Sequence, residues 1–329
     1  MKSAIIGLGN IARSHAISIR EHNLGDVVAI CDVKKDKMRK FKETYALDGA
    51  KEYENYLEML DTEEIDVVHI CTPHYLHKEM IIQCLKRNIN ALCEKPLCLR
   101  TEELQEIESA LQTSAARVGV VQQNRYNESA KYLKAYLADK EIVTGYATLV
   151  WNRDASYYAA TEWHGKLETE GGGVIINQAL HTLDLLQWFM GMPTSVCGNI
   201  AIFDEKDGVE VEDTAVGRFY GEKSSFEIFA SNTAEVDCDV HLIFKLKGGE
   251  ETIMFPAAVL TKEGYKTFEE KKPLGKDCYG SGHEKLIADF YACVKDGKPF
   301  ALDFEEASKV VKLFTALYRS HGKKINIEG

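Results

Sequence analysis

SAIIGLGNIARSH, residues 3–15, is the stretch that decides the fold. SAII is a short apolar run typical of a buried strand, and GLGNIA then matches the pattern G-x-G-x-x-G/A. In that pattern the first glycine allows a tight turn, the second lets a pyrophosphate approach the backbone, and the small last residue keeps the following helix close to the sheet. The same pattern also occurs in tight turns that bind nothing. The predicted dinucleotide contacts here are Gly7, Gly9, Asn10, Ile11 and Ala12.

An acidic residue follows at the distance that a dinucleotide site requires. The second apolar run, VVAIC, ends at Asp32, about 20 residues after the glycine turn. A carboxylate there accepts hydrogen bonds from both ribose hydroxyls of NAD and repels the 2′-phosphate of NADP. The neighbouring Lys34 and Lys35 leave NADP open, and a simple turn residue at a strand end is the other interpretation of Asp32.

Further apolar runs follow through residue 121. They are DVVHIC, NALCEK and VGVVQ, and helical segments are expected near residues 11–21, 37–45, 75–86 and 101–112. Strands that alternate with helices of this length indicate βαβ units and a parallel sheet. We therefore predict a doubly wound Rossmann domain over residues 1–121.

The pattern changes after residue 121. Helices are expected at 128–138, 177–190, 284–295 and 304–320, and strand signals dominate residues 195–255. No helix pattern interrupts those strands, so the predicted second domain, residues 122–329, is α/β with a large open sheet, mostly antiparallel or mixed.

Composition excludes several classes of protein. The chain has 329 residues, 45% of them hydrophobic, which is more than one core usually holds and favours two domains. A net charge of −11 argues against binding to nucleic acids or to anionic membranes. The sequence shows no apolar run of membrane-helix length and no signal-peptide pattern. The spacing of the nine cysteines does not indicate a disulfide framework, so we expect a cytoplasmic protein. Cys93 and Cys98 lack further ligands at metal-site spacing, so no metal is predicted.

Two of the strand ends carry polar side chains. Because ligands bind outside the carboxyl ends of strands in such sheets, the predicted cofactor contacts there are Thr72, Pro73, His74, His77, Glu94 and Lys95. The ammonium of Lys95 can also stabilise an alkoxide that forms in a reaction, which makes it a predicted catalytic residue. A surface lysine at a strand end, and for His77 a helix-surface histidine, are the other interpretations.

GGGVIINQALHTLD, residues 171–184, carries a second polar set. Asn177, His181 and Asp184 are spaced i, i+4 and i+7, so they share a face of the predicted helix. His181 suits proton transfer, and Asn177 and Asp184 are predicted to bind the substrate. A polar stripe that faces water is the alternative.

The segment between Trp151 and Gly171 is rich in aromatic side chains. Arg153 and Trp163 lie in it, with two tyrosines and a histidine. Aromatic faces with polar tips suit sugar rings, so Arg153 and Trp163 are predicted substrate ligands. Loop packing or an interface explains the same composition.

GLGNIA, TPHYLH, EKP and GGGVIINQALHTLD, in this order, resemble the Gfo/Idh/MocA oxidoreductases over the whole chain. The resemblance implies a Rossmann domain, a second domain whose open sheet makes dimer or tetramer contacts, and hydride transfer between NAD or NADP and sugars, inositols or related compounds. It implies that Lys95 and His181 are catalytic, although many members have Asp where this chain has Asn177. It also implies a cis bond before Pro96, cofactor contacts at Asn124 and Tyr126, and substrate contacts at Tyr279 and His283.

These features together predict an NAD-dependent dehydrogenase that acts on a secondary hydroxyl of a sugar or polyol. A non-catalytic dinucleotide-binding regulator on the same fold is one alternative. Other substrates of the same enzyme class, such as a dihydrodiol, a tetrapyrrole or an imine, are a second. Redox-neutral elimination or hydrolysis with tightly bound NAD is a third.

Overall fold

The apolar runs of the first 121 residues form one parallel sheet, as predicted. The computed structural model describes residues 1–269 and 282–328, and six strands lie in the order β3-β2-β1-β4-β5-β6, each parallel to its neighbours. They are β1 (Lys2–Ile6), β2 (Asp26–Cys31), β3 (Lys51–Tyr53), β4 (Val67–Ile70), β5 (Asn90–Glu94) and β6 (Val118–Val121). The strand order reverses direction between β1 and β4, which is where a doubly wound sheet opens a crevice for a ligand.

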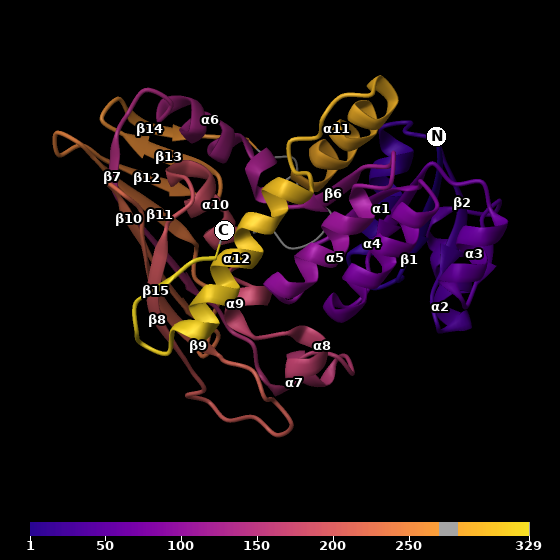
Figure 1. Ribbon diagram of the computed structural model, residues 1–329, viewed down its shortest axis with the longest axis horizontal. Coiled ribbons are helices and arrows are strands. Elements are labelled where there is room, and N and C mark those ends of the chain that lie inside the picture. The colour runs from indigo at the N-terminus through magenta and orange to yellow at the C-terminus, as the bar shows by residue number, and fades with distance from the viewer. Residues whose placement is uncertain (270–281, 329) are drawn as a thin grey trace. The chain divides into compact units, whose positions relative to one another are not determined.

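Helices connect these strands (Figure 1). They are α1 (Ala12–Glu21), α2 (Lys35–Tyr45), α3 (Tyr56–Thr62), η1 (His74–Leu76), α4 (His77–Lys86) and α5 (Thr101–Leu111). The sequence pattern missed β3 and α3, because β3 is a three-residue edge strand of polar composition, KEY. Within the described residues, no helix is both long and apolar enough to cross a membrane.

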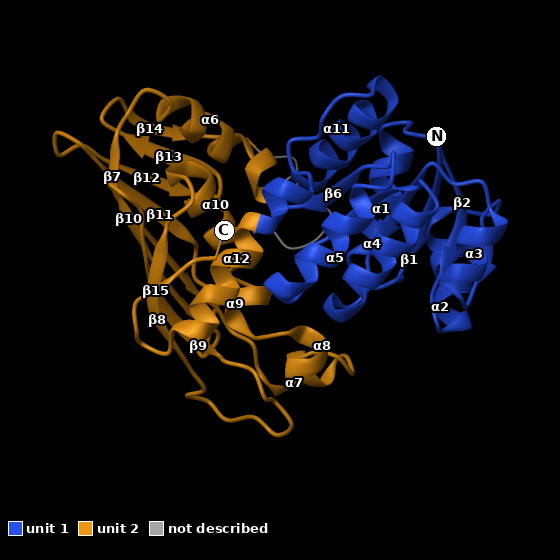
Figure 2. Cartoon of the chain, in the orientation of Figure 1, with its two compact units in different colours: residues 1–123, 281–308 blue, residues 124–280, 309–329 orange. Residues whose placement is uncertain are grey.

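The chain forms two compact units, shown in Figure 2. Unit 1 comprises residues 1–123 and 281–308, and unit 2 comprises residues 124–280 and 309–329. The predicted single division at residue 121 therefore needs a correction, because helix α11 (Gly282–Asp296) belongs to unit 1. It packs on α1 and β6 through Leu286, Ile287 and Phe290, and a Cβ atom at Gly119 would lie 2.7 Å from the Phe290 ring.

The second sheet is mixed, in agreement with the prediction. Its nine strands lie in the order β14-β13-β12-β11-β7-β10-β9-β8-β15, and β10 runs parallel to β7 while the other pairs are antiparallel. They are β7 (Ile142–Val150), β8 (Ser195–Ala201), β9 (Thr214–Tyr220), β10 (Ser225–Ser231), β11 (His241–Leu246), β12 (Glu251–Phe255), β13 (Ala258–Thr261), β14 (Gly264–Thr267) and β15 (Ile325–Asn326). The sequence pattern missed the three short strands β13, β14 and β15.

The second sheet has one buried and one open face. Along β7, Ala147 and Leu149 are buried while Tyr146 and Thr148 are exposed, which is the alternation expected when one face meets water. The helices and the 3₁₀ turn of this part of the chain are η2 (Gln123–Tyr126), α6 (Glu128–Tyr136), α7 (Ala155–Ala159), α8 (Leu167–Glu170), α9 (Val174–Asn177) and α10 (Leu180–Met190). Helix α12 (Phe304–Ser320) begins in unit 1 and continues into unit 2. Helix α10 packs closely on β7, since a Cβ atom at Gly145 would lie 2.4 Å from the sulfur of Met190.

Candidate active site

The glycine turn after β1 has the shape that a dinucleotide phosphate needs. Gly7 has a φ of +84°, and a Cβ atom there would lie 2.7 Å from the carbonyl oxygen of Cys71, so only glycine fits. A Cβ atom at Gly9 would meet nothing within 4 Å, so the backbone is open at that point. The N-cap residue of α1, Ile11, makes no side-chain hydrogen bond to the helix, and the first turn holds no acidic side chain. These features fit a pyrophosphate at the helix N-terminus.

Asp32 lies at the carboxyl end of β2 and is held against the glycine turn. One oxygen of its carboxylate accepts a hydrogen bond from the backbone N–H of Leu8 at 2.9 Å, and the other accepts one from the N–H of Lys34 at 2.9 Å. The side chain is partly exposed, and a carboxylate has lone pairs left for ribose hydroxyls. Of the two lysines that left NADP open, Lys35 pairs with Glu54 at 2.9 Å.

The polar residues after β4 divide into two groups. Thr72 and Pro73 are partly exposed, whereas His74 is 4% and His77 is 0% exposed. The ring nitrogens of His77 lie 2.7 Å from the carbonyl oxygen of Pro96 and 2.9 Å from that of Thr72. We predicted a cofactor contact for His77, but its ring is fully buried and connects the segment after β4 to the segment after β5.

Lys95 directly follows β5, on the carboxyl edge of the parallel sheet. The peptide bond between Lys95 and Pro96 is cis, which confirms what the family resemblance implied. The Lys95 side chain is partly exposed, while Glu94, Pro96 and Leu97 on either side of it are buried. Because the residues on both sides of Lys95 are buried, the backbone that carries this lysine is held in place.

In unit 2, the predicted helix over 177–190 is interrupted. Helix α9 ends at Asn177, and α10 begins at Leu180 after a break at Gln178 and Ala179. Asn177 and His181 therefore do not share one continuous helix face, which corrects the prediction. His181 lies in the first turn of α10 and is 8% exposed.

Two buried carboxylates hold Asn177 and the start of α9. The side-chain NH₂ of Asn177 donates to the hydroxyl of Tyr157 at 3.0 Å and to the carboxylate of Glu170, which is 1% exposed. The second carboxylate, Glu212, accepts the N–H groups of Gly173 at 2.7 Å and Ile175 at 3.1 Å and so caps α9. Burial raises the pKa of Glu212, although these hydrogen bonds oppose the shift.

The aromatic segment between Trp151 and Gly171 is anchored to Asn177 through the hydroxyl of Tyr157. The ring of Tyr157 stacks on His164 at 4.7 Å, and Trp163 lies 4.0 Å from His164. The guanidinium of Arg153 lies 4.9 Å from the ring of Trp151 and 5.2 Å from that of Tyr157. The structure therefore brings Arg153, Trp163 and Asn177, three predicted substrate ligands, into one continuous network.

Asp184 has a different set of partners. Both of its oxygens accept hydrogen bonds from Arg125, at 2.5 and 2.7 Å, and the two side chains are 1% and 5% exposed. Arg125 also donates to Gln187 at 3.2 Å and lies 5.4 Å from the ring of Trp188. These contacts anchor η2 to α10, and the substrate contact of Asp184 stays a prediction.

The remaining predicted residues lie in three places. Asn124 and Tyr126 are on η2, and the ring of Tyr126 lies 4.9 Å from the ammonium of Lys131. His283 lies in the first turn of α11 in unit 1, where its Nε2 is 3.3 Å from the carboxylate of Glu94. Tyr279 falls outside the described residues.

Two sequence models of one family match the chain. The oxidoreductase family with an NAD-binding Rossmann fold matches residues 1–122, and the GFO/IDH/MocA C-terminal domain matches residues 133–250. The chain belongs to the Gfo/Idh/MocA family. It is accordingly an NAD-dependent dehydrogenase with an N-terminal Rossmann domain.

Relatives of this family member cover the chain to different extents. Myo-inositol 2-dehydrogenase of Thermotoga maritima is 22% identical over 340 residues, which span 100% of this chain and 98% of that protein. Glucose-6-phosphate 3-dehydrogenase of Bacillus subtilis is 29% identical over 141 residues, 43% of this chain and 39% of that protein.

Solved structures of the family share the fold. The WlbA dehydrogenase of Bordetella pertussis, in complex with NADH and UDP-GlcNAcA, has a TM-score of 0.85 and 24% identity, with 100% and 99% of the two chains covered. Levoglucosan dehydrogenase, in complex with NADH and levoglucosan, has a TM-score of 0.88 and 16% identity, with both chains fully covered.

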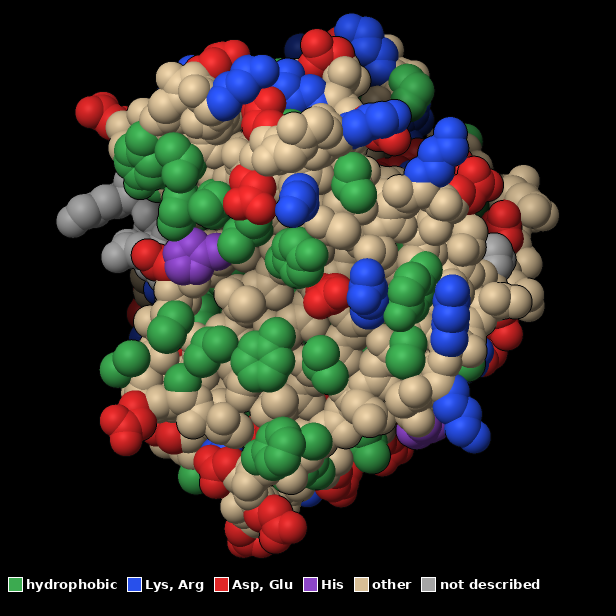
Figure 3. Space-filling view, turned by 90° about the vertical axis from the view of Figure 1, so that its left-hand side faces the viewer, with side chains coloured by type: hydrophobic (Ala, Val, Ile, Leu, Met, Phe, Trp, Pro, Cys, Tyr) green, Lys and Arg blue, Asp and Glu red, His purple; other side chains and the backbone are tan. Residues whose placement is uncertain are grey.

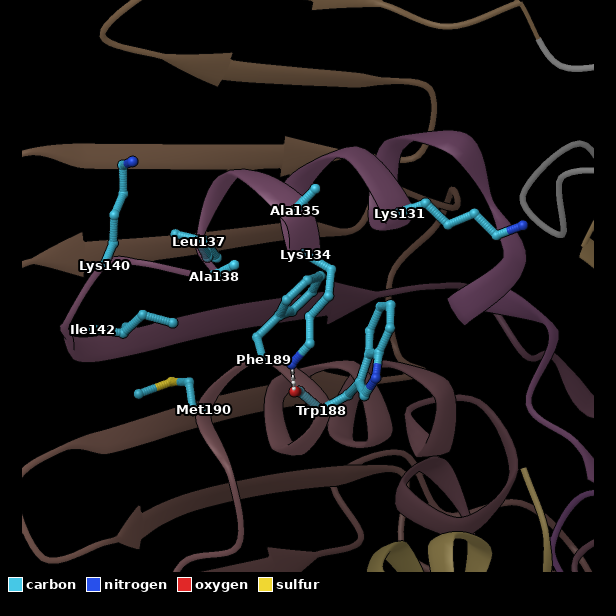
Figure 4. Close-up of a pocket in the computed structure, with 10 residues that line it drawn as sticks. All are labelled: Lys131, Lys134, Ala135, Leu137, Ala138, Lys140, Ile142, Trp188, Phe189 and Met190. Atoms are coloured by element: carbon cyan, nitrogen blue, oxygen red, sulfur yellow. Dashed lines mark hydrogen bonds between the residues drawn. The ribbon is translucent and has the colours of Figure 1, made fainter. Parts of the chain in front are cut away.

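A groove of about 740 Å³ in this Gfo/Idh/MocA protein lies between α6 and the end of α10. Its lining includes Lys131, Lys134 and Lys140, but Figure 4 shows that these side chains point in different directions. Lys134 donates to the carbonyl oxygen of Trp188 at 2.5 Å, in the last turn of α10, where a cation stabilises a helix. The lysines therefore do not converge on a common ligand.

Sequence reasoning missed Glu170 and Glu212. Glu170 precedes the glycine triplet and resembles any acidic residue in a solvated turn, and Glu212 lies in the acidic run VEVED. The glycines carry the only signal, because a Cβ atom at Gly173 would lie 1.9 Å from the backbone oxygen of Glu212. That close approach is what places Glu212 under α9.

Replacing Asn177 with aspartate is expected to destabilise unit 2 by about 1–3 kcal/mol at neutral pH, since a carboxylate would face buried Glu170 where the amide now donates a hydrogen bond to it. In the folded variant, the two neighbouring carboxyl groups would share a proton that they release in the unfolded chain. The loss of folding stability therefore grows as pH rises through the ordinary carboxyl range. Denaturant titrations at several pH values measure it. The exposed Asn199→Asp is the control, and equal stability of the two variants at neutral pH would contradict the expectation.

Proposed function

We propose that this dehydrogenase interconverts a secondary hydroxyl of a sugar, polyol or sugar derivative with the corresponding ketone. NAD, when bound, accepts the hydride from the carbon that carries the hydroxyl. The Lys95 ammonium donates to the reacting oxygen and stabilises the negative charge that develops on it. The His181 imidazole takes the hydroxyl proton, and Asn177 orients the substrate.

The observation that carries this proposal is the polar and aromatic network around Asn177 in unit 2. Arg153, Tyr157 and Trp163 combine ring faces with hydrogen-bonding tips, which is the chemistry that recognises a sugar ring. Support also comes from relatives whose names give inositol and glucose 6-phosphate as substrates. On the side of unit 1, Lys95 lies on the sheet edge where doubly wound domains bind cofactors.

A panel of sugars, inositols and sugar nucleotides tests the proposal. We expect at least one member to reduce NAD, measured by NADH absorbance, and the corresponding ketone to oxidise NADH. A simple secondary alcohol without further hydroxyls serves as the control and should react far more slowly. The proposal fails if NADH binds but no member of the panel reacts in either direction.

We also propose that the open face of the second sheet joins copies of this chain. The register places Tyr265, Leu260, Ile253, Ile243 and Tyr146 side by side across five strands, and Phe229 pairs with Val216 on the same sheet. Phe229 is 41% and Val216 is 52% exposed. Figure 3 shows hydrophobic side chains across the middle of this face, interspersed with charged ones. Exposed apolar patches of this kind mark association surfaces.

Light scattering after size exclusion is expected to give a multiple of the 37.0 kDa chain mass for the wild type and a smaller assembly for Phe229→Glu. Val236→Glu is the control, because Val236 is 68% exposed but lies outside the strands of the sheet. A monomeric wild-type protein at micromolar concentration would rule out this interface.

A further inference from the structure

A chain of buried side chains in unit 1 ends at Glu94. Ser3 on β1 contacts the hydroxyl of Tyr291 on α11 at 2.5 Å, and that hydroxyl lies 2.7 Å from Nε2 of His69 on β4. Nδ1 of His69 lies 2.7 Å from Nδ1 of His15 on α1, and Nε2 of His15 lies 3.0 Å from the Glu94 carboxylate. The exposed fractions run from 0% to 6%, so protein groups alone satisfy these contacts.

With Glu94 ionised and both imidazoles neutral, only one arrangement of protons satisfies all four contacts. A carboxylate only accepts, so His15 donates from Nε2 and must accept at Nδ1. His69 then donates from Nδ1 and accepts at Nε2 from Tyr291, which accepts in turn from Ser3. Every donor in the chain therefore points toward Glu94, and each bond polarises the next.

The ionisation tendencies of His69 and Tyr291 agree with this arrangement. Burial lowers the pKa of His69 well below its usual range and raises that of Tyr291, so both groups stay neutral. Burial by itself raises the pKa of Glu94, but hydrogen bonds from His15 and His283, together with the attraction of these imidazoles when protonated, hold that pKa well below its usual range. The titratable groups around Glu94 are His15, His69, Cys71, His77, Cys93, Lys95 and His283.

We propose that Ser3, Tyr291, His69 and His15 are positioning residues that keep Glu94 ionised and in one orientation beside Lys95. Glu94 is the last residue of β5 and Lys95 is the next in the chain, so the carboxylate lies on the edge that binds the cofactor. The inference rests on the proposed function for the cofactor contact of Glu94. These four residues contact neither cofactor nor substrate in this assignment, and they act only through Glu94.

The test is the pH dependence of NADH binding, measured without substrate by fluorescence titration of the full chain. Loss of hydrogen-bond donors raises the pKa of Glu94. As the pH is lowered, the NADH affinity of such a variant should therefore begin to fall at a higher pH than that of the wild type. We expect shifts of about 1–2 pH units for His15→Leu, which removes the direct donor. Polarisation through the chain gives roughly 0.5 unit for Tyr291→Phe and less for Ser3→Ala. A graded response with distance along the chain is what a merely structural role would not produce.

Three further measurements test the same proposal. Ser18→Ala removes another buried hydroxyl of α1, which donates to the Ser14 carbonyl oxygen, and should leave the pH at which NADH affinity falls unchanged. In a Glu94→Gln background, Tyr291→Phe should no longer shift the curve. Nitrogen NMR of labelled histidine should show the Nδ1–H tautomer for His69 and the Nε2–H tautomer for His15.

Unshifted curves for both Tyr291→Phe and Ser3→Ala, an equal shift for Ser18→Ala, or the opposite tautomer of His69 would overturn the proposal. Because no substrate is present, these outcomes are separate from failure of the sugar assignment. A wild type that does not bind NADH would instead refute the proposed function.

Discussion

Lys95→Ala is expected to lower kcat by about 10²–10⁴-fold while NADH binding changes only a few-fold. The ammonium is the group assigned to the reacting oxygen, so its loss removes stabilisation that exists only in the transition state. In the proposed function the cofactor is held mainly by the turn at Gly7–Ala12 and by Asp32, and the local structure of neither depends on the lysine. His181→Ala removes the proposed base and should lower kcat by a similar factor. Steady-state kinetics with a responding sugar and fluorescence titration with NADH separate the two effects.

Matched controls come from residues of the same type outside the site. Lys78→Ala removes a lysine of unit 1 that pairs with Glu106 at 2.9 Å, and His241→Ala removes a histidine of β11 in unit 2. Both should retain kcat within about a factor of two, as surface substitutions usually do. Small primary amines should partly restore turnover in Lys95→Ala. The assignment would be wrong if Lys95→Ala and His181→Ala both kept full turnover.

The sequence predicted the first sheet well because its strands are buried on both faces and therefore read as continuous apolar runs. The same reasoning explains the strand that was missed. β3 contributes KEY at the sheet edge, where burial does not select apolar side chains. The hydrophobic pattern of α11 could not predict that this helix belongs to unit 1. An amphipathic pattern shows that one face of a helix is buried but does not identify the surface that covers it. The partner of α11 is identified only by contacts such as that of Phe290 over Gly119.

In the candidate site, too, the sequence pattern did not identify which residues contact each other. Lys95 and the glycine turn were predictable because their position relative to strand ends fixes their place in a doubly wound sheet. Asn177 was assigned to a helix face that the break at Gln178 and Ala179 does not allow. Its partner Glu170 is seven residues earlier, beyond a glycine turn whose conformation no periodicity encodes. The amide of Asn177 donates a hydrogen bond to this buried acidic side chain, a pairing that the sequence pattern does not indicate.

Arg125→Met is expected to destabilise unit 2 by about 3–5 kcal/mol, because it leaves the Asp184 carboxylate buried without its partner. For a unit of this size the shift in Tm is roughly 6–20 °C. The double variant Arg125→Met/Asp184→Leu should recover most of that loss, since an apolar pair needs no compensating charge. Arg39→Met is the control, because Arg39 and Asp36 form an exposed pair worth about 0.5 kcal/mol or less. Calorimetry of the four proteins without cofactor decides the matter: a loss no larger for Arg125→Met than for Arg39→Met would show that the guanidinium does not hold η2 to α10.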